Sequence, residues 1–483
     1  MLIYPTIKMS PLLGLQGSGG GLGYLAGGVS GYPADTFWIS EAAKGNWGSE
    51  YVKDIAGDNE GNIYVVSTRY DAGGNGYLGN SIVKHAADGT VSWQKINYRT
   101  ASPYPMEIKS VIAEPDGDHI YFSGAADAGM FVTKVNKNDG SVDWRRRLGS
   151  VTAGNSNPCI AIGSGGNPIV VARLTDASDA QGYFSLNESD GTTDWKTLIK
   201  KTSGNTTAST HMLTPAVDSS GNIHTVVWGD TGHPNYYNAV IKHNSSGVFQ
   251  SISDYRSPYT NEDMISDIAV DSSGNKYVAF RFVSGSGQQF KVGIMKLNSS
   301  DVIQWQKAIS GTSPNYMTPN NIVVMPEDAG IILSIEDRQN QGDSADGRVS
   351  FVRFDMSGNV VWKRHFGVGD GGSGININGS NGRMKLNRNG NIIFDTRFSS
   401  GGAIYTVVAQ LPADGSLTGD TVIGSRTYNW SANTRFSFSD QTIFSKQGSS
   451  IFSSATNSLS NNSYDTNMTT ADNVQTFTKG DVD

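Results

Sequence analysis

The feature that most constrains the fold is a short phrase that recurs along the chain. Its clearest copy runs from Asp267 to Val278 and reads Asp-Ile-Ala-Val-Asp-Ser-Ser-Gly-Asn-Lys-Tyr-Val. Apolar residues at every second position are typical of a half-buried β-strand. Asp271 can accept a hydrogen bond from the backbone of the turn, and Gly274 can adopt a positive φ without steric cost. The phrase therefore predicts a strand, a tight turn and a second strand.

Seven copies can be followed, and they begin at Asp54, Val111, Ile160, Ala216, Asp267, Ile322 and Met384. An apolar segment, a polar turn and a segment with an aromatic marker follow each of the first six copies. These markers are Trp93, Trp144, Trp195, Phe249, Trp305 and Trp362, spaced 51 to 57 residues apart. A four-stranded unit of roughly 40 to 50 residues is typical of a propeller blade. We predict an all-β fold, a seven-bladed β-propeller of four-stranded antiparallel blades.

One aromatic marker precedes the first copy of the repeat, and none follows the last copy. Trp38 lies 55 positions before Trp93 with no inner strands before it, and no aromatic marker follows the seventh copy, at about 383–411. A closed ring removes exposed sheet edges. We therefore predict that an N-terminal strand at Trp38 completes the seventh blade, in a propeller spanning residues 36–430.

Composition narrows the classes of protein to consider. The 58 glycines and the 17% of charged residues suit a turn-rich extracellular or particle-bound protein. A net charge of −7 disfavours binding to nucleic acid through bulk electrostatics. No stretch approaches the roughly 20 apolar residues that insert across a membrane. The single cysteine, Cys159, can form no intrachain disulfide, and we expect it in the core.

Two flanking segments differ from the repeats. Residues 1–35 are apolar and then Gly-rich, and Pro11 interrupts the apolar run, so they do not resemble a signal peptide. We interpret them as a docking arm, because exposed apolar clusters usually mark contacts; a disordered leader is the alternative. The docking candidates are Leu2, Ile3, Tyr4, Leu12, Leu13 and Leu15. The composition of residues 431–483, rich in Ser, Thr and Asn, predicts an extended tail that packs on the propeller or a neighbouring subunit, with disorder as the alternative.

Recognition is expected on one face of the ring. The connections between second and third strands and those between blades vary in length, and in a propeller both sets open onto the same face. Variable loops on a rigid scaffold usually carry recognition. The binding candidates there are Tyr98, Tyr104, Trp228, Tyr236, Tyr237, Tyr255 and Tyr259. Their rings can stack on sugars or contact proteins, or they can cover blade edges.

No catalytic, metal or cofactor residues are assigned. The seven histidines form no recognisable triad, and no His or Cys cluster has zinc spacing. The Asp-Ser-Ser-Gly-Asn turns lack the ligand alternation of a calcium loop, and their repetition favours a turn role. A pair of carboxylates from distant loops stays open as a polysaccharide depolymerase site, with Asp71, Asp230, Glu262, Asp263 and Glu336 as candidates.

The repeated phrase, with the Lys-Leu-Asn strand and Trp-Gln-Lys that follow it, resembles bacterial β-propeller repeats of the SBBP or PQQ-like type over residues 36–425. The Gly-rich start, the repeats and the Ser/Thr-rich tail together resemble virion proteins of bacteriophages, especially those of marine cyanobacteria. That resemblance implies a non-enzymatic tail or fibre component of the phage particle. It also implies contacts with other virion proteins or with a host receptor or polysaccharide, and several copies in a symmetric assembly.

A second resemblance favours an enzyme. Residues 136–144, Asn-Lys-Asn-Asp-Gly-Ser-Val-Asp-Trp, resemble the tryptophan-docking turn of quinoprotein dehydrogenases. Members of that family look like eight-bladed periplasmic proteins with a signal peptide. This chain has seven copies of the repeat, no vicinal cysteine pair and no assignable calcium ligands. The dehydrogenase is therefore kept as an alternative to the virion protein.

Overall fold

The structure is a computed structural model of the 483-residue chain. It describes residues 37–43, 49–70, 77–99, 107–126, 129–148, 158–174, 180–201, 215–230, 236–257, 263–284, 289–310, 316–338, 348–369, 383–387, 389–400, 403–416, 418–423, 426–434, 436–447, 452–455, 461–463, 468–472 and 477–481. These residues are mostly in strands, with one 3-10 turn, η1 (Pro326–Asp328). Within them, no helix is long and apolar enough to cross a membrane.

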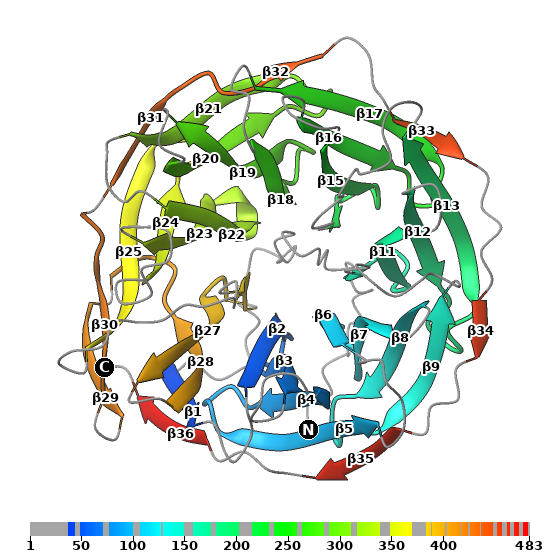
Figure 1. Cartoon of the computed structure of the whole chain (residues 1–483), viewed down its shortest axis with the longest axis vertical. Helices are drawn as coiled ribbons and strands as arrows, with labels where there is room; N and C mark the ends of the chain where they lie inside the picture. The colour runs from blue at the N-terminus through cyan, green and yellow to red at the C-terminus, as the bar shows by residue number, and fades with distance from the viewer. Residues whose placement is uncertain are drawn as a thin grey trace, which may run out of the picture.

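The strands pair into four-stranded antiparallel ladders that follow one another around a ring (Figure 1). Blade 1 contains β2 (Ser49–Gly57), β3 (Ile63–Tyr70), β4 (Tyr77–His85) and β5 (Val91–Arg99). Blade 2 contains β6 (Glu107–Ala113), β7 (His119–Ala126), β8 (Gly129–Asn136) and β9 (Val142–Leu148). Blade 3 contains β10 (Cys159–Ile162), β11 (Pro168–Leu174), β12 (Ala180–Leu186) and β13 (Thr193–Lys201). Blade 4 contains β14 (Ala216–Val217), β15 (Ile223–Asp230), β16 (Tyr236–His243) and β17 (Phe249–Arg256).

The second half of the ring continues the pattern. Blade 5 contains β18 (Met264–Val270), β19 (Lys276–Ser284), β20 (Gln289–Leu297) and β21 (Ile303–Ser310). Blade 6 contains β22 (Tyr316–Val324), β23 (Ile331–Arg338), β24 (Arg348–Phe354) and β25 (Val360–Gly369). One parallel bridge, Phe290 to Tyr316, joins these two ladders into a single sheet. Blade 7 contains β26 (Met384–Leu386), β27 (Ile392–Ser400), β28 (Ala403–Leu411) and β1 (Trp38–Ala43). The all-β propeller prediction is confirmed.

The N-terminal strand closes the last ladder. β1 pairs antiparallel with β28, from Trp38 opposite Gln410 to Ala43 opposite Tyr405. The Trp38 ring is fully buried, and its Nε1 donates a hydrogen bond to the Ala87 carbonyl of blade 1 at 3.1 Å. A strand from the start of the chain therefore completes blade 7 and links it to blade 1, as the position of the first marker predicts.

An aromatic ring on the outer strand of one blade packs on a turn of the next blade. The pairs are Trp38 with Gly89, Trp93 with Gly140, Trp144 with Gly191, Trp195 with Gly247, Trp305 with Gly358 and Trp362 with Gly415. Each of these glycines has a positive φ, and a Cβ added there would lie within 3.2 Å of the ring. In blade 5 the turn has Asp301 at φ 62 instead, and its carbonyl accepts a hydrogen bond from Tyr255 Oη at 2.7 Å.

The innermost strands are joined by side chains placed at β-bulges. β2 has a register shift between Val52 and Asp54. Asp54 Oδ2 accepts hydrogen bonds from Ser110 Oγ at 2.7 Å and from Val111 N at 3.0 Å in blade 2. Ser110 Oγ in turn accepts from Ile160 N of blade 3 at 3.4 Å. A bulge turns each of these side chains sideways, so that it contacts the next blade.

Blades 5, 6 and 7 repeat the same arrangement. Asp267 Oδ2 accepts from Asn321 Nδ2 at 3.2 Å and from Ile322 N at 2.9 Å, while Oδ1 accepts from Ile268 N at 2.9 Å. Asn321 Oδ1 then accepts from Met384 N of blade 7 at 3.1 Å. We call the four bulge residues Asp54, Ser110, Asp267 and Asn321 the inner seam.

The C-terminal tail adds an outermost strand to every blade. Its strands are β29 (Gly419–Ile423), β30 (Arg426–Ala432), β31 (Ser437–Asp440), β32 (Ser445–Lys446), β33 (Phe452–Ala455), β34 (Asn461–Ser463), β35 (Met468–Asp472) and β36 (Phe477–Asp481). β30 to β35 pair in turn with β25, β21, β17, β13, β9 and β5, and β36 pairs with β1. The tail thus runs backwards around its own ring (Figure 1, orange to red). We call these tail strands the belt; β30 crosses the expected boundary between residues 430 and 431.

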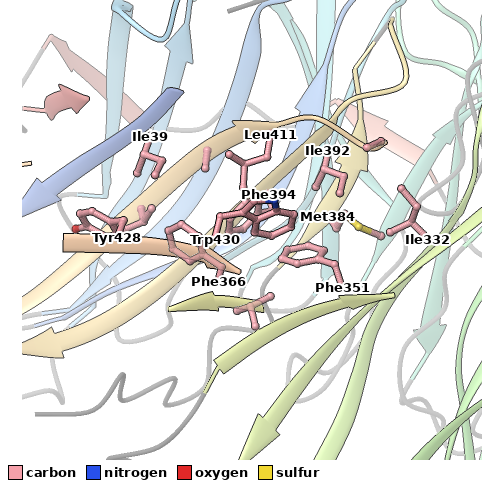
Figure 2. Close-up of a cluster of buried hydrophobic side chains, with 14 of the residues drawn as sticks. Ile39, Ile332, Phe351, Phe366, Met384, Ile392, Phe394, Leu411, Tyr428 and Trp430 are labelled. Carbon is pink, nitrogen blue, oxygen red and sulfur yellow. The ribbon is translucent and has the colours of Figure 1, made fainter. Parts of the chain in front are cut away.

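The start of the belt is anchored in the core. Figure 2 shows Tyr428 and Trp430 among apolar side chains of blades 6 and 7. The Trp430 ring centroid lies 5.3 Å from that of Phe351, which lies 4.9 Å from that of Phe394. Trp430 is 2% exposed. Belt residues therefore supply part of the hydrophobic core between these blades, and burial of such rings contributes strongly to stability.

Candidate functional site: the axial cation patch

The two faces of the ring differ in their connections. Tight turns such as 58–62 and 86–90 join first to second strands and third to fourth strands at one face. The connections between second and third strands and between blades, such as 71–76 and 100–106, leave from the opposite strand ends. These longer connections lie outside the described residues. We call the first face the turn face and the second the loop face.

The turn face is held by repeated carboxylate contacts. Asp58 accepts hydrogen bonds from Asn62 N at 2.9 Å and from Tyr64 Oη at 2.8 Å. Burial and the nearby Asp58 carboxylate raise the pKa of Tyr64, so the phenol stays a donor. Tyr277 donates to Asp271 in the same way at 3.0 Å. The Asp-x-x-Gly carboxylates are thus occupied within their own turns, which is the role predicted for them.

One group on the turn face has the composition of a metal site. Glu114, His119 and Glu188 each offer a ligand atom, and these atoms lie within 4.8 Å of one another. However, Glu114 Oε1 accepts from Tyr121 Oη at 2.7 Å, and Lys134 Nζ lies 3.0 Å from Glu188 Oε1. The Tyr121–Glu114 contact is the blade 2 form of the Tyr–Asp contact found in blades 1 and 5. Since the repeat itself accounts for these contacts, the group is assigned a structural role.

The predicted loop-face aromatics are only partly described. Tyr104 and Tyr259 lie outside the described residues, and for Tyr98, Tyr236 and Tyr237 the structure describes the strand backbone. Trp228 is half-buried on β15. Tyr255 was expected on the loop face, but its side chain is fully buried and bonded to the Asp301 carbonyl. Its ring therefore packs between blades 4 and 5 and offers no surface for binding.

The other predicted residues fall into three groups, one of which is Asp230, for which the structure describes the backbone at the end of β15. The docking candidates Leu2, Ile3, Tyr4, Leu12, Leu13 and Leu15 lie outside the described residues, as do the carboxylate candidates Asp71 and Glu262. Asp263 and Glu336 are described, and both side chains are buried. Asp263 Oδ1 accepts from Val283 N at 2.9 Å, and burial raises the pKa of this carboxyl to about 6. These two acids are therefore enclosed in blades 5 and 6.

A group that the sequence did not reveal lies on the loop-face half of the innermost strands. Lys53 on β2 and Lys109 on β6 each precede a bulge residue, Arg383 directly precedes β26, and Arg397 lies on the neighbouring β27. The Tyr51 ring joins two of them: the Arg397 guanidinium carbon lies 4.1 Å from the ring centroid, and Lys53 Nζ lies 5.5 Å from it. We call Lys53, Lys109, Arg383 and Arg397 the axial cation patch.

The patch holds more positive than negative charge. Burial, followed by the positive charge of Lys109, lowers the pKa of Lys53 to about 8; Arg383 and Arg397 act in the same direction, and Glu107 opposes them. Glu107 forms an ion pair with Lys109. Asp395 beneath the patch has a pKa raised well above its usual range by burial, so it neutralises the cations poorly. Cations brought together in this way favour an anion as ligand.

The patch had one signal in the sequence. Met384 N bonds to Asn321 as Ile322 N bonds to Asp267, so Arg383 occupies in blade 7 the position of the inner-seam residues. An arginine there replaces an acidic or neutral polar side chain. Recognising this required the exact alignment of the copies, and the seventh copy is among the least regular in sequence.

No family model and no curated protein matches the chain. Among solved structures, BamB from Moraxella catarrhalis matches with 13% identity over 78% of this chain and 92% of that chain, at a TM-score of 0.36. The Dos1 propeller matches with 7% identity over 78% and 94%, at 0.42. Phage phi92 endosialidase matches with 10% identity over 81% and 72%, at 0.41. At these scores the matches assign neither activity nor partner.

Proposed function

We propose that this protein is a non-enzymatic component of a bacteriophage virion, a tail or fibre protein that makes its outward contacts through the loop face. The observation that carries the proposal is the belt. Because the tail strands pair with the outer edge of every blade, the rim of the ring is occupied by the chain itself. The turn face is likewise filled by carboxylate and tryptophan contacts within the repeat. The loop face is left as the surface with variable connections.

The layout of the chain supports a place in a particle. The apolar segment 1–35 is suited to docking on another virion protein, and the propeller then presents its loop face to a host surface or a neighbouring virion protein. A ring closed by both ends of its own chain resists the exposure of sheet edges. Such a rigid ring suits a protein that repeats in several copies within a symmetric assembly.

Gold-labelled antibody imaging of purified phage particles tests this proposal. Serum raised against residues 36–430 is expected to label the tail or fibre tips. Label on the shell would replace the attachment role with a decorating role. Absence of label from all particles, with the protein detected in infected cells, would contradict the virion assignment. Calcium-dependent dye reduction after quinone reconstitution would instead revive the dehydrogenase alternative.

A further inference from the structure

We infer that the axial cation patch is a binding site for an oxyanion group, carboxylate or sulfate, of an acidic polysaccharide. This inference rests on the proposed function, because it names what the loop face recognises. The patch combines Lys53, Lys109 and Arg383, which are half-buried and within reach of a ligand, with the more deeply buried Arg397. Half-buried cations bind oxyanions more strongly than exposed ones, since their charges are less screened by solvent.

The surrounding strands bring these side chains together. β2 packs against β6 on one side and against β26 and β27 on the other, so the patch spans blades 7, 1 and 2. The Tyr51 ring lies against Arg397 and Lys53, and cation–π contact orients both groups. The fold therefore holds together like charges that repel one another.

The carboxylates described near the patch, Asp54, Glu107 and Asp395, are fewer than its four cations. Neutral donors, namely Ser110 Oγ and the backbone N–H groups of Val111 and Ile55, hold Asp54 within the inner seam, so it offsets at most one cation. Glu107 balances Lys109. Asp395 Oδ1 accepts from the backbone of Arg383 at 3.2 Å, and its own burial disfavours its charge.

Lys385 is buried beside the patch, and burial lowers its pKa, which disfavours its charged form. An incoming oxyanion would offset the positive charge of the patch, and it would raise the pKa of Lys53 towards its ordinary value.

The chain as a whole is acidic, with a net charge of −7. Nucleic acid gains its affinity from many phosphate contacts made at once, and an acidic surface offers few of them outside the patch. An acidic polysaccharide meets the same repulsion, but one of its carboxylates or sulfates can enter the patch while its sugar rings make contacts that do not depend on charge. Aromatic side chains expected around the same face would then contact the sugar rings.

Binding of the full chain to dextran sulfate, alginate and uncharged dextran tests the inference. We expect both acidic polymers to bind and dextran not to bind, and their relative affinities distinguish sulfate from carboxylate. Lys53→Gln should weaken binding by about tenfold, because it removes one charge-assisted contact. Lys196→Gln makes the same charge change at an exposed position on β13 and should stay within about twofold. Lys109→Gln is a second site variant, and thermal melts check that each variant folds.

A chemical readout separates the site from general charge effects. Amines are labelled in their neutral form, so a bound anion that raises the pKa of Lys53 should slow its labelling by acetic anhydride at pH 8 but leave Lys196 unchanged.

Equal binding of dextran, or full affinity in folded Lys53→Gln and Lys109→Gln, would overturn the inference. Tighter, Lys53-dependent binding of single-stranded DNA would overturn the polysaccharide assignment. Gold-labelled phage particles together with no polymer binding would contradict only this inference. Polymer binding together with no gold label on the particles would contradict only the virion role.

Discussion

The inner seam and the outer rim both join neighbouring blades, but they do so with different chemistry. At the inner seam, buried polar side chains such as Asp267 accept hydrogen bonds from the innermost strand of the next blade. At the outer rim, tryptophan rings pack on glycine turns, and the belt continues each sheet. The inner contacts depend on charge and hydrogen bonding in a buried place, whereas the outer contacts depend on shape and on backbone pairing. The two regions should therefore respond differently to substitution, to pH and to truncation.

The largest effect is expected at the inner seam. Asp267→Ala leaves the buried donors Ile268 N, Asn321 Nδ2 and Ile322 N without their acceptor, which should cost roughly 3 to 5 kcal/mol in the free energy of unfolding. Ser266→Ala is the matched control on the same strand, because its Oγ makes one hydrogen bond, to the Ala279 carbonyl. It should cost about 1 kcal/mol. Urea unfolding measures both, and equal costs would contradict a special role for the seam carboxylate.

A pair of glycines isolates the packing contribution at the rim. Gly247 and Gly274 have nearly equal φ values of 74° and 76°. A Cβ at Gly247 would lie 2.1 Å from the Trp195 ring, whereas at Gly274 its nearest contact would be Ser299 at 3.7 Å. Alanine should therefore cost about 1 kcal/mol at Gly274 from backbone strain alone. At Gly247 it should cost about 1 to 3 kcal/mol more. Similar melting temperatures for the two variants would show that the ring does not pack on that turn.

Acid should weaken the rim at the closure. His85 is fully buried, lies 5.5 Å from the Trp38 ring, and has a pKa lowered to about 4 by burial. Below pH 6.5 the unfolded chain takes up a proton that the folded chain does not, so stability falls as pH decreases from about 6.5 to 4. The His85 contribution at pH 5.5 is about 1 kcal/mol. Urea midpoints at pH 7.5 and pH 5.5 should differ less in His85→Gln than in the unchanged chain; an equal difference would exclude His85 as a source of the acid sensitivity.

The sequence predicted the periodic parts of this comparison. Alternation and turn residues were sufficient for the blades, and the marker at Trp38 was sufficient for the closing strand, because both depend on local pattern. The belt was harder, since its strands are as short as Ser445–Lys446 and their partners lie far away in sequence. Tyr255 was misplaced because it was assigned to the connection between two blades, whereas it lies on β17 and the fold buries its ring against the following blade.

The cation patch was missed for a related reason. Lys53, Lys109 and Arg383 come from copies separated by more than fifty residues, and no spacing along the chain brings them together. Only the ring places blades 7, 1 and 2 side by side. Burial, which lowers the pKa of Lys53, is also a property of the packed blades rather than of the local sequence. The residues that meet in the patch are thus set by closure of the ring, and closure depends on the two ends of the chain.

Hydrogen exchange of β1 tests most directly whether both chain ends close the ring. β1 lies between β28 and β36, so its amides alternate between two partner strands. In the full chain, peptides covering residues 38–43 should be protected throughout. After truncation at residue 447, which removes β33 to β36, about half of these amides should exchange rapidly while those facing β28 stay protected. Peptides covering β30 serve as the internal control. Unchanged protection of β1 after truncation would contradict the pairing of the belt with the blades, and would indicate that the tail packs on a partner outside the ring.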